Sequence, residues 1–150
     1  MKKRWRRWLL LSVLLGLGIA GCRMQQTGQG AGAAVVVQAG GTATAVALGP
    51  EVDPGTVAEL SAEDAIAVID VREAWEYQEG HIAGATLIPL GSLADRTDEI
   101  PTDKPVVLVC RSGNRSARAY RYLADEGFDN IHNMTGGMLG WEAAGLDVTR

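Results

Sequence analysis

Two short runs of the chain are apolar at every position, and they constrain the fold more than any other feature. Residues 65–69 read Ala-Ile-Ala-Val-Ile and residues 106–109 read Val-Val-Leu-Val. Successive strand residues point to opposite faces of a sheet, so a strand without a polar face must be covered on both faces. Such burial is typical of parallel sheets, and it favours an α/β fold.

The segment after the second run predicts how that sheet is connected. Residues 116–126 read as a helix that ends at Gly127, and another short strand follows at 131–134. The predicted helix would place one face inward, formed by Ala117, Tyr120, Leu123 and Ala124. Strand, helix and strand at this spacing form a βαβ unit, whose strands are parallel. A further strand is expected at 85–88.

The first 21 residues are expected to be a secretory signal peptide and not part of the fold. A basic head without acids precedes an apolar run at 9–19, and about 11 residues are too few to span a bilayer comfortably. The run ends in Ile19-Ala20-Gly21-Cys22, which resembles the lipobox of bacterial lipoproteins. That resemblance implies that Cys22 is lipidated and begins the mature chain. We therefore expect an extracytoplasmic, membrane-anchored lipoprotein on the periplasmic or cell-surface side.

The charge distribution argues against nucleic acid as a partner. Five of the 14 basic residues precede Cys22 and all 18 acidic residues follow it, so the chain after residue 21 has a net charge of −9. An acidic protein of this kind repels phosphate backbones.

Residues 22–49 are rich in Gly, Ala and Thr and favour a flexible tether, although 35–37 and 46–48 are strand-like enough to pair. Residues 50–150 are long enough for one domain.

The residues that point to chemistry follow the buried run 106–109. Cys110 stands where that strand ends, and Arg111-Ser112-Gly113-Asn114-Arg115-Ser116 leads into the helix. Ligands of α/β sheets bind beyond the carboxyl ends of the strands. Loop N–H groups, the helix N-terminus and two guanidinium groups would all favour a thiolate. If Cys22 is lipidated, Cys110 has no partner within the chain, which suits a reactive cysteine.

Four segments in order resemble the rhodanese-like domain family. The loop Cys110–Arg115 is similar to the family's six-residue active-site loop. The first of the other three segments is Asp70-Val71-Arg72-Glu73 with Trp75-Glu76-Tyr77. The second is Gly80-His81-Ile82-Ala83-Gly84-Ala85 with Ile88-Pro89-Leu90, and the third is Gly136-Gly137-Met138 with Trp141. The match is poorer over 51–63, where the family's first strand and helix look short. The resemblance implies an α/β fold with a central, mainly parallel five-stranded sheet and helices on both faces.

The family resemblance also implies a reaction and its site residues. Single-domain sulfurtransferases of this family take a sulfane sulfur from a thiosulfate- or persulfide-type donor and hold it as a cysteine persulfide, here on Cys110. The sulfur then passes to a thiol, sulfite or cyanide, and a protein acceptor is possible. The substrate-binding loop would comprise Arg111, Ser112, Gly113, Asn114, Arg115 and Ser116. Arg111 is expected to contact substrate, whereas Arg115 either grips the donor or pairs with an acid and braces the loop. No cofactor and no metal are expected.

Two related chemistries fit the sequence less well. Tyrosine-type phosphatases need an arginine six positions after the cysteine, but that position is Ser116 and the arginine arrives one residue earlier. The smaller ring of N–H groups suits a persulfide better than a tetrahedral phosphate. Thioredoxin-type exchange needs a second cysteine at the position of Gly113. The remaining alternatives are a low-turnover binding module or a persulfide sensor on the same fold.

Other polar residues near the loop have structural interpretations. Asp70 and Arg72 are expected to form a buried or half-buried pair that fixes neighbouring loops. His81 is expected to be a hydrogen-bonded structural histidine, with proton transfer as the alternative. Trp75 and Trp141 are interpreted as packing residues. Nothing around His132 indicates a metal site.

Overall fold

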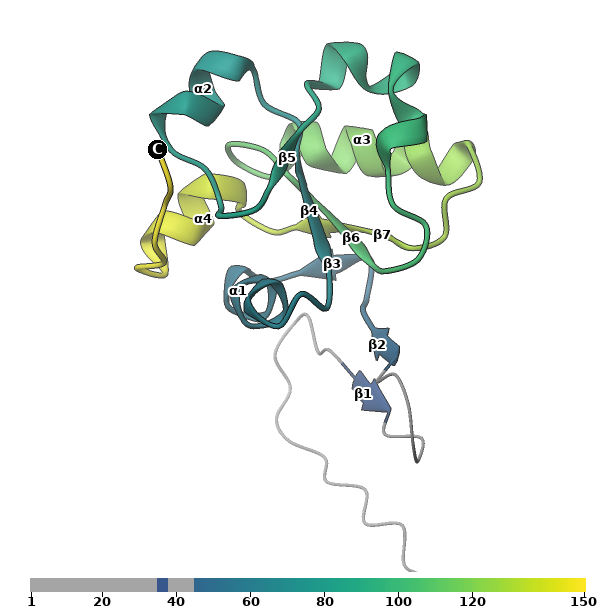
Figure 1. Cartoon of the computed structure of the whole chain (residues 1–150), viewed down its shortest axis with the longest axis horizontal. Coiled ribbons are helices and arrows are strands. Elements are labelled where there is room, and N and C mark those ends of the chain that lie inside the picture. The colour runs from purple at the N-terminus through teal and green to yellow at the C-terminus, as the bar shows by residue number, and fades with distance from the viewer. Residues whose placement is uncertain (1–34, 38–44) are drawn as a thin grey trace, which may run out of the picture.

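The computed structural model describes residues 35–37 and 45–150 of the chain, drawn as ribbon in Figure 1. The predicted signal peptide and Cys22 lie outside the described residues. Part of the predicted tether at 22–49 forms a short antiparallel pair, β1 (Val35–Val37) with β2 (Ala45–Ala47). The first strand coincides with the apolar run 35–37 and the second overlaps the run 46–48, within a segment for which the sequence favoured a flexible tether.

The central sheet has five strands in the order β3-β7-β6-β4-β5, and every pairing within it is parallel. This confirms the predicted α/β fold. The strands are β3 (Glu51–Val52), β4 (Ala67–Asp70), β5 (Thr86–Leu87), β6 (Val106–Val109) and β7 (Ile131–Met134). The strand expected at 85–88 is only two residues long, and the sheet edge at β3 is equally short.

Helices cover both faces of the sheet, as predicted (Figure 1). Val107 and Val109 of β6 face the core shared with α1 and α4, whereas Val106 and Leu108 face the core beneath α3. Both faces of β6 are therefore apolar because both are buried. The helices are α1 (Pro54–Ala62), α2 (Ala74–Glu79), α3 (Asn114–Asp125) and α4 (Gly137–Ala143), with 3-10 turns η1 (Leu90–Asp95) and η2 (Thr97–Glu99).

Helix α3 buries only part of the face that we predicted: Leu123 is buried and Tyr120 packs against the core. The helix begins at Asn114, two residues earlier than expected, and its buried residues are Ser116, Ala119 and Leu123. Ala124, which we predicted to face inward, is exposed. Ser116 is turned toward the end of β6, where its hydroxyl lies 3.4 Å from the Cys110 sulfur. Hydrophobic periodicity does not reveal a polar residue buried in this way.

Candidate active site

Cys110 lies at the carboxyl end of β6, the central strand of the sheet, and the chain turns sharply after it. Gly113 makes the turn with φ at +91° and directly precedes α3. A Cβ at Gly113 would lie 3.4 Å from the Gly136 nitrogen and 3.5 Å from the Met134 carbonyl oxygen. A left-handed conformation beside tight backbone contacts is suited to glycine. The loop is therefore closed by backbone packing on its inner side.

The Cys110 sulfur accepts hydrogen bonds from the loop that follows it. The Gly113 N–H donates to Sγ at 3.1 Å, and the Ser116 hydroxyl lies 3.4 Å from Sγ. Burial raises the pKa of the Cys110 thiol, but hydrogen bonds from the Ser116 hydroxyl and from the backbone of Ser116, Ser112 and Gly113 outweigh it, so the net pKa is lowered. The site therefore favours the thiolate that sulfur chemistry needs.

Ser116 connects the sulfur to the loop backbone. Its hydroxyl also lies 3.1 Å from the Gly113 carbonyl oxygen, so its single proton has two acceptors. An ionised sulfur attracts that proton more strongly than a neutral thiol does. Ser116 is fully buried, and we had included it among the substrate-binding residues. In the structure it lies behind the loop and contacts the sulfur from within the fold.

The N-terminal end of α4 holds the other side of the loop. The Met138 N–H donates to the Cys110 carbonyl oxygen at 2.8 Å, and the Leu139 N–H donates to the Arg111 carbonyl oxygen at 3.0 Å. Gly137 has φ at +56°, and a Cβ there would lie 2.3 Å from the Cys110 carbonyl oxygen. Only glycine lets these backbones approach so closely. The sequence marked Gly137 as a family landmark but did not reveal this contact.

Arg115 is held by an acid from another helix. Its two terminal nitrogens donate to the two carboxylate oxygens of Glu76, each at 2.6 Å. The hydrogen bonds from Arg115 are the largest influence on Glu76, and they lower its pKa to about 2. Burial acts in the opposite direction, and the backbone of Glu73 adds a smaller lowering contribution. This geometry favours the second of the two roles that we considered for Arg115, a brace between α2 and the loop. Glu76 was missed as a site residue because its partner lies far along the chain.

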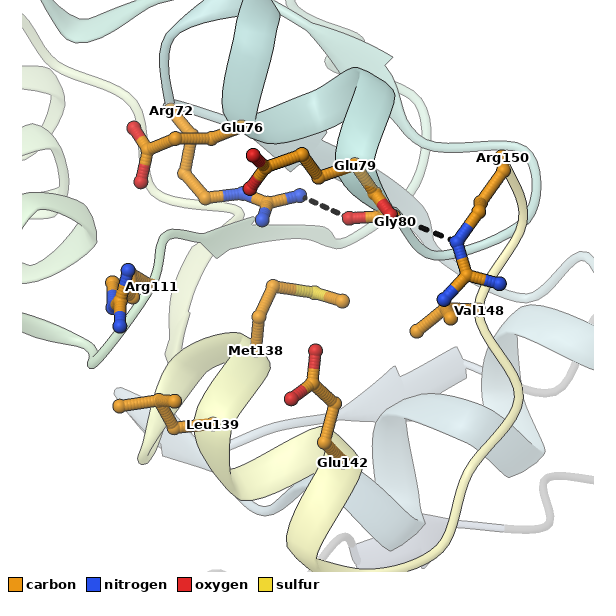
Figure 2. Close-up of a pocket in the computed structure, with 10 residues that line it drawn as sticks. All are labelled: Arg72, Glu76, Glu79, Gly80, Arg111, Met138, Leu139, Glu142, Val148 and Arg150. Atoms are coloured by element: carbon orange, nitrogen blue, oxygen red, sulfur yellow. Dashed lines mark hydrogen bonds between the residues drawn. The ribbon is translucent and has the colours of Figure 1, made fainter.

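The remaining loop side chains are exposed to solvent. Arg111, Ser112 and Asn114 all lie on the outer surface, and the Asn114 amide donates to the Ser112 hydroxyl at 3.3 Å. Cys110 itself is only 1% exposed. Beside it, Arg111 forms one end of a pocket of about 160 Å³ between α2, α4 and the segment 148–150 (Figure 2).

Asp70 and Arg72 form a buried ion pair beneath this pocket. The Arg72 guanidinium donates to the Asp70 carboxylate at 2.6–2.9 Å and to the Gly80 carbonyl oxygen at 2.8 Å. The pair therefore ties β4 to the turn after α2. His81 stacks on the Tyr77 ring, with centroids 3.7 Å apart, and its Nδ1 lies 2.9 Å from the Tyr77 carbonyl oxygen. These contacts are those of a structural histidine.

The two tryptophans differ in exposure. Trp141 is buried in the core, and its indole N–H donates to the Asp147 carbonyl oxygen at 2.9 Å. Trp75 is 59% exposed at the start of α2.

Within residues 35–37 and 45–150, no cluster of three or more His, Cys, Asp or Glu side chains could hold a metal ion. The same described residues contain no helix with the length and apolar character needed to cross a bilayer.

Comparisons with known proteins show similarity over most of the domain that contains this site. Residues 53–144 match the family described as rhodanese-like domain. The chain is 49% identical over 74 residues to the uncharacterized protein YqhL of Bacillus subtilis, covering 49% of this chain and 59% of that protein. It is 35% identical over 86 residues to the thiosulfate sulfurtransferase GlpE of Pseudoalteromonas translucida, covering 57% of this chain and 82% of that protein. A crystal structure of a rhodanese-related protein from Thermoplasma volcanium superposes with a TM-score of 0.62 at 32% identity, covering 66% of this chain and 96% of the other.

Proposed function

Since this chain belongs to the rhodanese-like domain family, we propose that it is a sulfurtransferase that carries a sulfane sulfur as a persulfide on Cys110. The observation that carries the proposal is the hydrogen bond of 3.1 Å from the Gly113 N–H to Sγ, in a loop that lowers the pKa of the thiol. Backbone donors aimed at the sulfur stabilise its negative charge before and after the sulfur is loaded.

The first step is attack of the Cys110 thiolate on the outer sulfur of the donor. With thiosulfate, the Sγ–S bond forms as the donor's S–S bond breaks, and the electron pair leaves with sulfite. The charge of the thiolate is retained on the new persulfide. In the second step a thiophile such as sulfite, cyanide or a thiol attacks the outer sulfur, and the electron pair of that S–S bond returns to Sγ. No net oxidant or reductant is needed.

The burial of Cys110 supports a donor with a protruding terminal sulfur. The residue is 1% exposed, so a bulky electrophile has little access to it. A terminal sulfur is a single atom, and the persulfide places the transferable sulfur about 2 Å beyond Sγ, toward the acceptor. The similarity to a protein named thiosulfate sulfurtransferase adds support for this class of donor.

The test is direct observation of the persulfide. The purified domain is incubated with thiosulfate or with glutathione persulfide, and its intact mass is measured. We expect the wild type to gain the mass of one sulfur atom and Cys110→Ala to gain none, while cyanide then removes the added sulfur. A wild-type protein that gains no sulfur from either donor contradicts the proposal and leaves a binding or persulfide-sensing role on the same fold.

We also propose that the chain is an extracytoplasmic lipoprotein anchored through Cys22. The support is the basic head, the short apolar run and the small residues Ala20 and Gly21 before the cysteine. Expression of the full chain with labelled palmitate in a bacterial host should label the wild type and Cys110→Ala but not Cys22→Ala. Equal labelling of Cys22→Ala would refute the anchor, as would absence of label from the wild type.

A further inference from the structure

The pocket beside the active-site loop is built from three separate parts of the chain. Glu76 and Glu79 come from α2, Met138 and Glu142 from α4, and the segment 148–150 closes the third side. This segment is held in place because His81 and Thr149 exchange backbone hydrogen bonds at 2.9 and 2.8 Å. The walls of the pocket are therefore fixed by backbone contacts. Its volume of about 160 Å³ is small compared with the roughly 300–1,000 Å³ of drug-sized sites.

Two of the charged groups that line the pocket are already satisfied. Glu76 forms its bidentate pair with Arg115, and the Arg72 guanidinium is bonded to Asp70 and to the Gly80 carbonyl oxygen. A buried ion pair with this geometry has little remaining capacity to bind an external charge. These residues are therefore structural parts of the wall and do not select the ligand.

Four other charged groups remain available to a ligand. Among the described residues, the side chains of Glu79, Glu142 and Arg111 have no hydrogen-bond or ion-pair partner, and Arg150 uses only its Nε, which donates to the Glu79 carbonyl oxygen at 3.1 Å. Figure 2 shows Arg111 at one end of the pocket, Arg150 at the other, and the Glu142 carboxylate pointing into the space between them. The pocket thus offers two cations and two anions to one small ligand.

This balance of charge does not match a simple inorganic anion. Thiosulfate, sulfite and cyanide carry only negative charge, so Glu79 and Glu142 would repel them while Arg111 attracts them. A ligand with an ammonium group and a carboxylate group satisfies both signs at once. Met138, a residue only 2% exposed, lines the pocket and gives a short carbon chain a small apolar contact. The pocket therefore has the chemistry of a site for an amino acid.

We propose that this pocket binds the organic part of an amino-acid-type persulfide, such as cysteine persulfide, and that Glu142 and Arg150 make it a preferred sulfur donor. The inference rests on the proposed sulfurtransferase function. Arg111, which directly follows Cys110 in the chain, lines one end of the pocket. In the proposed arrangement the sulfur end of the ligand lies at Arg111, on the side of the reactive loop. The Cys110 thiolate attacks the outer sulfur of R–S–S–H, the Sγ–S bond forms, and the electron pair of the broken S–S bond leaves as R–S⁻. The sulfane sulfur keeps its proton and moves from the sulfur of the donor to Sγ of Cys110.

The experiment compares cysteine persulfide with thiosulfate as donors in steady-state kinetics. In Glu142→Gln and in Arg150→Gln we expect KM for cysteine persulfide to rise about tenfold with kcat little changed, which corresponds to the loss of one charged contact. The kcat/KM for thiosulfate should stay within about twofold or rise in Glu142→Gln, because a repelling carboxylate has been removed. The matched controls Glu126→Gln and Arg121→Gln change exposed residues of the same types on or beside α3 and should affect neither donor.

Three outcomes would overturn the inference. Equal losses for both donors, with a lowered unfolding temperature, would mean that Glu142 and Arg150 only support the fold. Unchanged kinetics with cysteine persulfide would mean that the pocket does not bind the donor, although the sulfurtransferase function would stand. If wild-type Cys110 gains sulfur from neither donor, the proposed function itself is wrong and the donor assignment is wrong with it.

Discussion

Replacing Glu76 with glutamine should destabilise the domain in a strongly pH-dependent way. The Glu76 side chain is 7% exposed and that of Arg115 is 31% exposed, and two hydrogen bonds of 2.6 Å join them. The pKa of Glu76 falls from 4.5 to about 2. At about 1.4 kcal/mol per pKa unit, this shift corresponds to about 3 kcal/mol of stabilisation at neutral pH. Because solvent screens part of the pair at Arg115, we expect about 2 kcal/mol in measurement.

The sign of the pH dependence follows from the lowered pKa. A carboxylate whose pKa is lower in the folded state stabilises the fold fully above its unfolded pKa, and the stabilisation is lost as the pH falls toward the folded value. For a folded pKa of about 2, the unscreened contribution falls from about 3 kcal/mol at pH 7 to about 1 kcal/mol at pH 3. More than half of the difference between wild type and variant should therefore disappear over this range.

Urea unfolding of wild type and Glu76→Gln at pH 7 and at pH 3 measures this difference. The matched control is Glu99→Gln, because Glu99 also makes a bidentate pair with an arginine, Arg96, but on the exposed surface. We expect a much smaller effect there. If the variant is as destabilised at pH 3 as at pH 7, the charge of Glu76 is not the source of the stabilisation and the reasoning is refuted.

Three further predictions concern the sulfur and its supports. Ser116→Ala removes a hydrogen bond that lowers the pKa of Cys110, so the pH midpoint of sulfur uptake from thiosulfate should rise. Ser112→Ala leaves the Ser116 hydroxyl in place and should shift the midpoint less. Gly137→Ala places a Cβ 2.3 Å from the Cys110 carbonyl oxygen and should lower the rate of sulfur transfer at least about tenfold. The control Gly84→Ala has open space around the added Cβ. It should lower the free energy of unfolding by only about 1–2 kcal/mol and retain activity. Asp70→Asn leaves the buried Arg72 without its anion and should cost about 3 kcal/mol in urea unfolding; a loss under about 1 kcal/mol would show that Gly80 alone suffices for Arg72.

Much of the fold and of the active-site loop could be predicted from neighbouring residues. The apolar sequence of β6 follows from burial on both faces, and the strand, loop and helix around Cys110 could be read in order along the chain. Gly113 lies where the predicted loop meets the predicted helix, and its φ of +91° is one that glycine adopts readily. These features depend on steric limits and periodicity within a few residues, so the local sequence contains the information.

The tertiary structure alone decided which distant groups meet at the loop. Arg115 pairs with Glu76, 39 residues earlier, because the parallel arrangement brings the segments after β4 and β6 to the same edge of the sheet. Tertiary packing also assembles the charged pocket from α2, α4 and 148–150. The strength of an ion pair depends on distance and burial in space, and sequence spacing contains neither quantity. The sequence therefore indicated which atom is the candidate nucleophile, whereas the packing of distant segments decided what surrounds it.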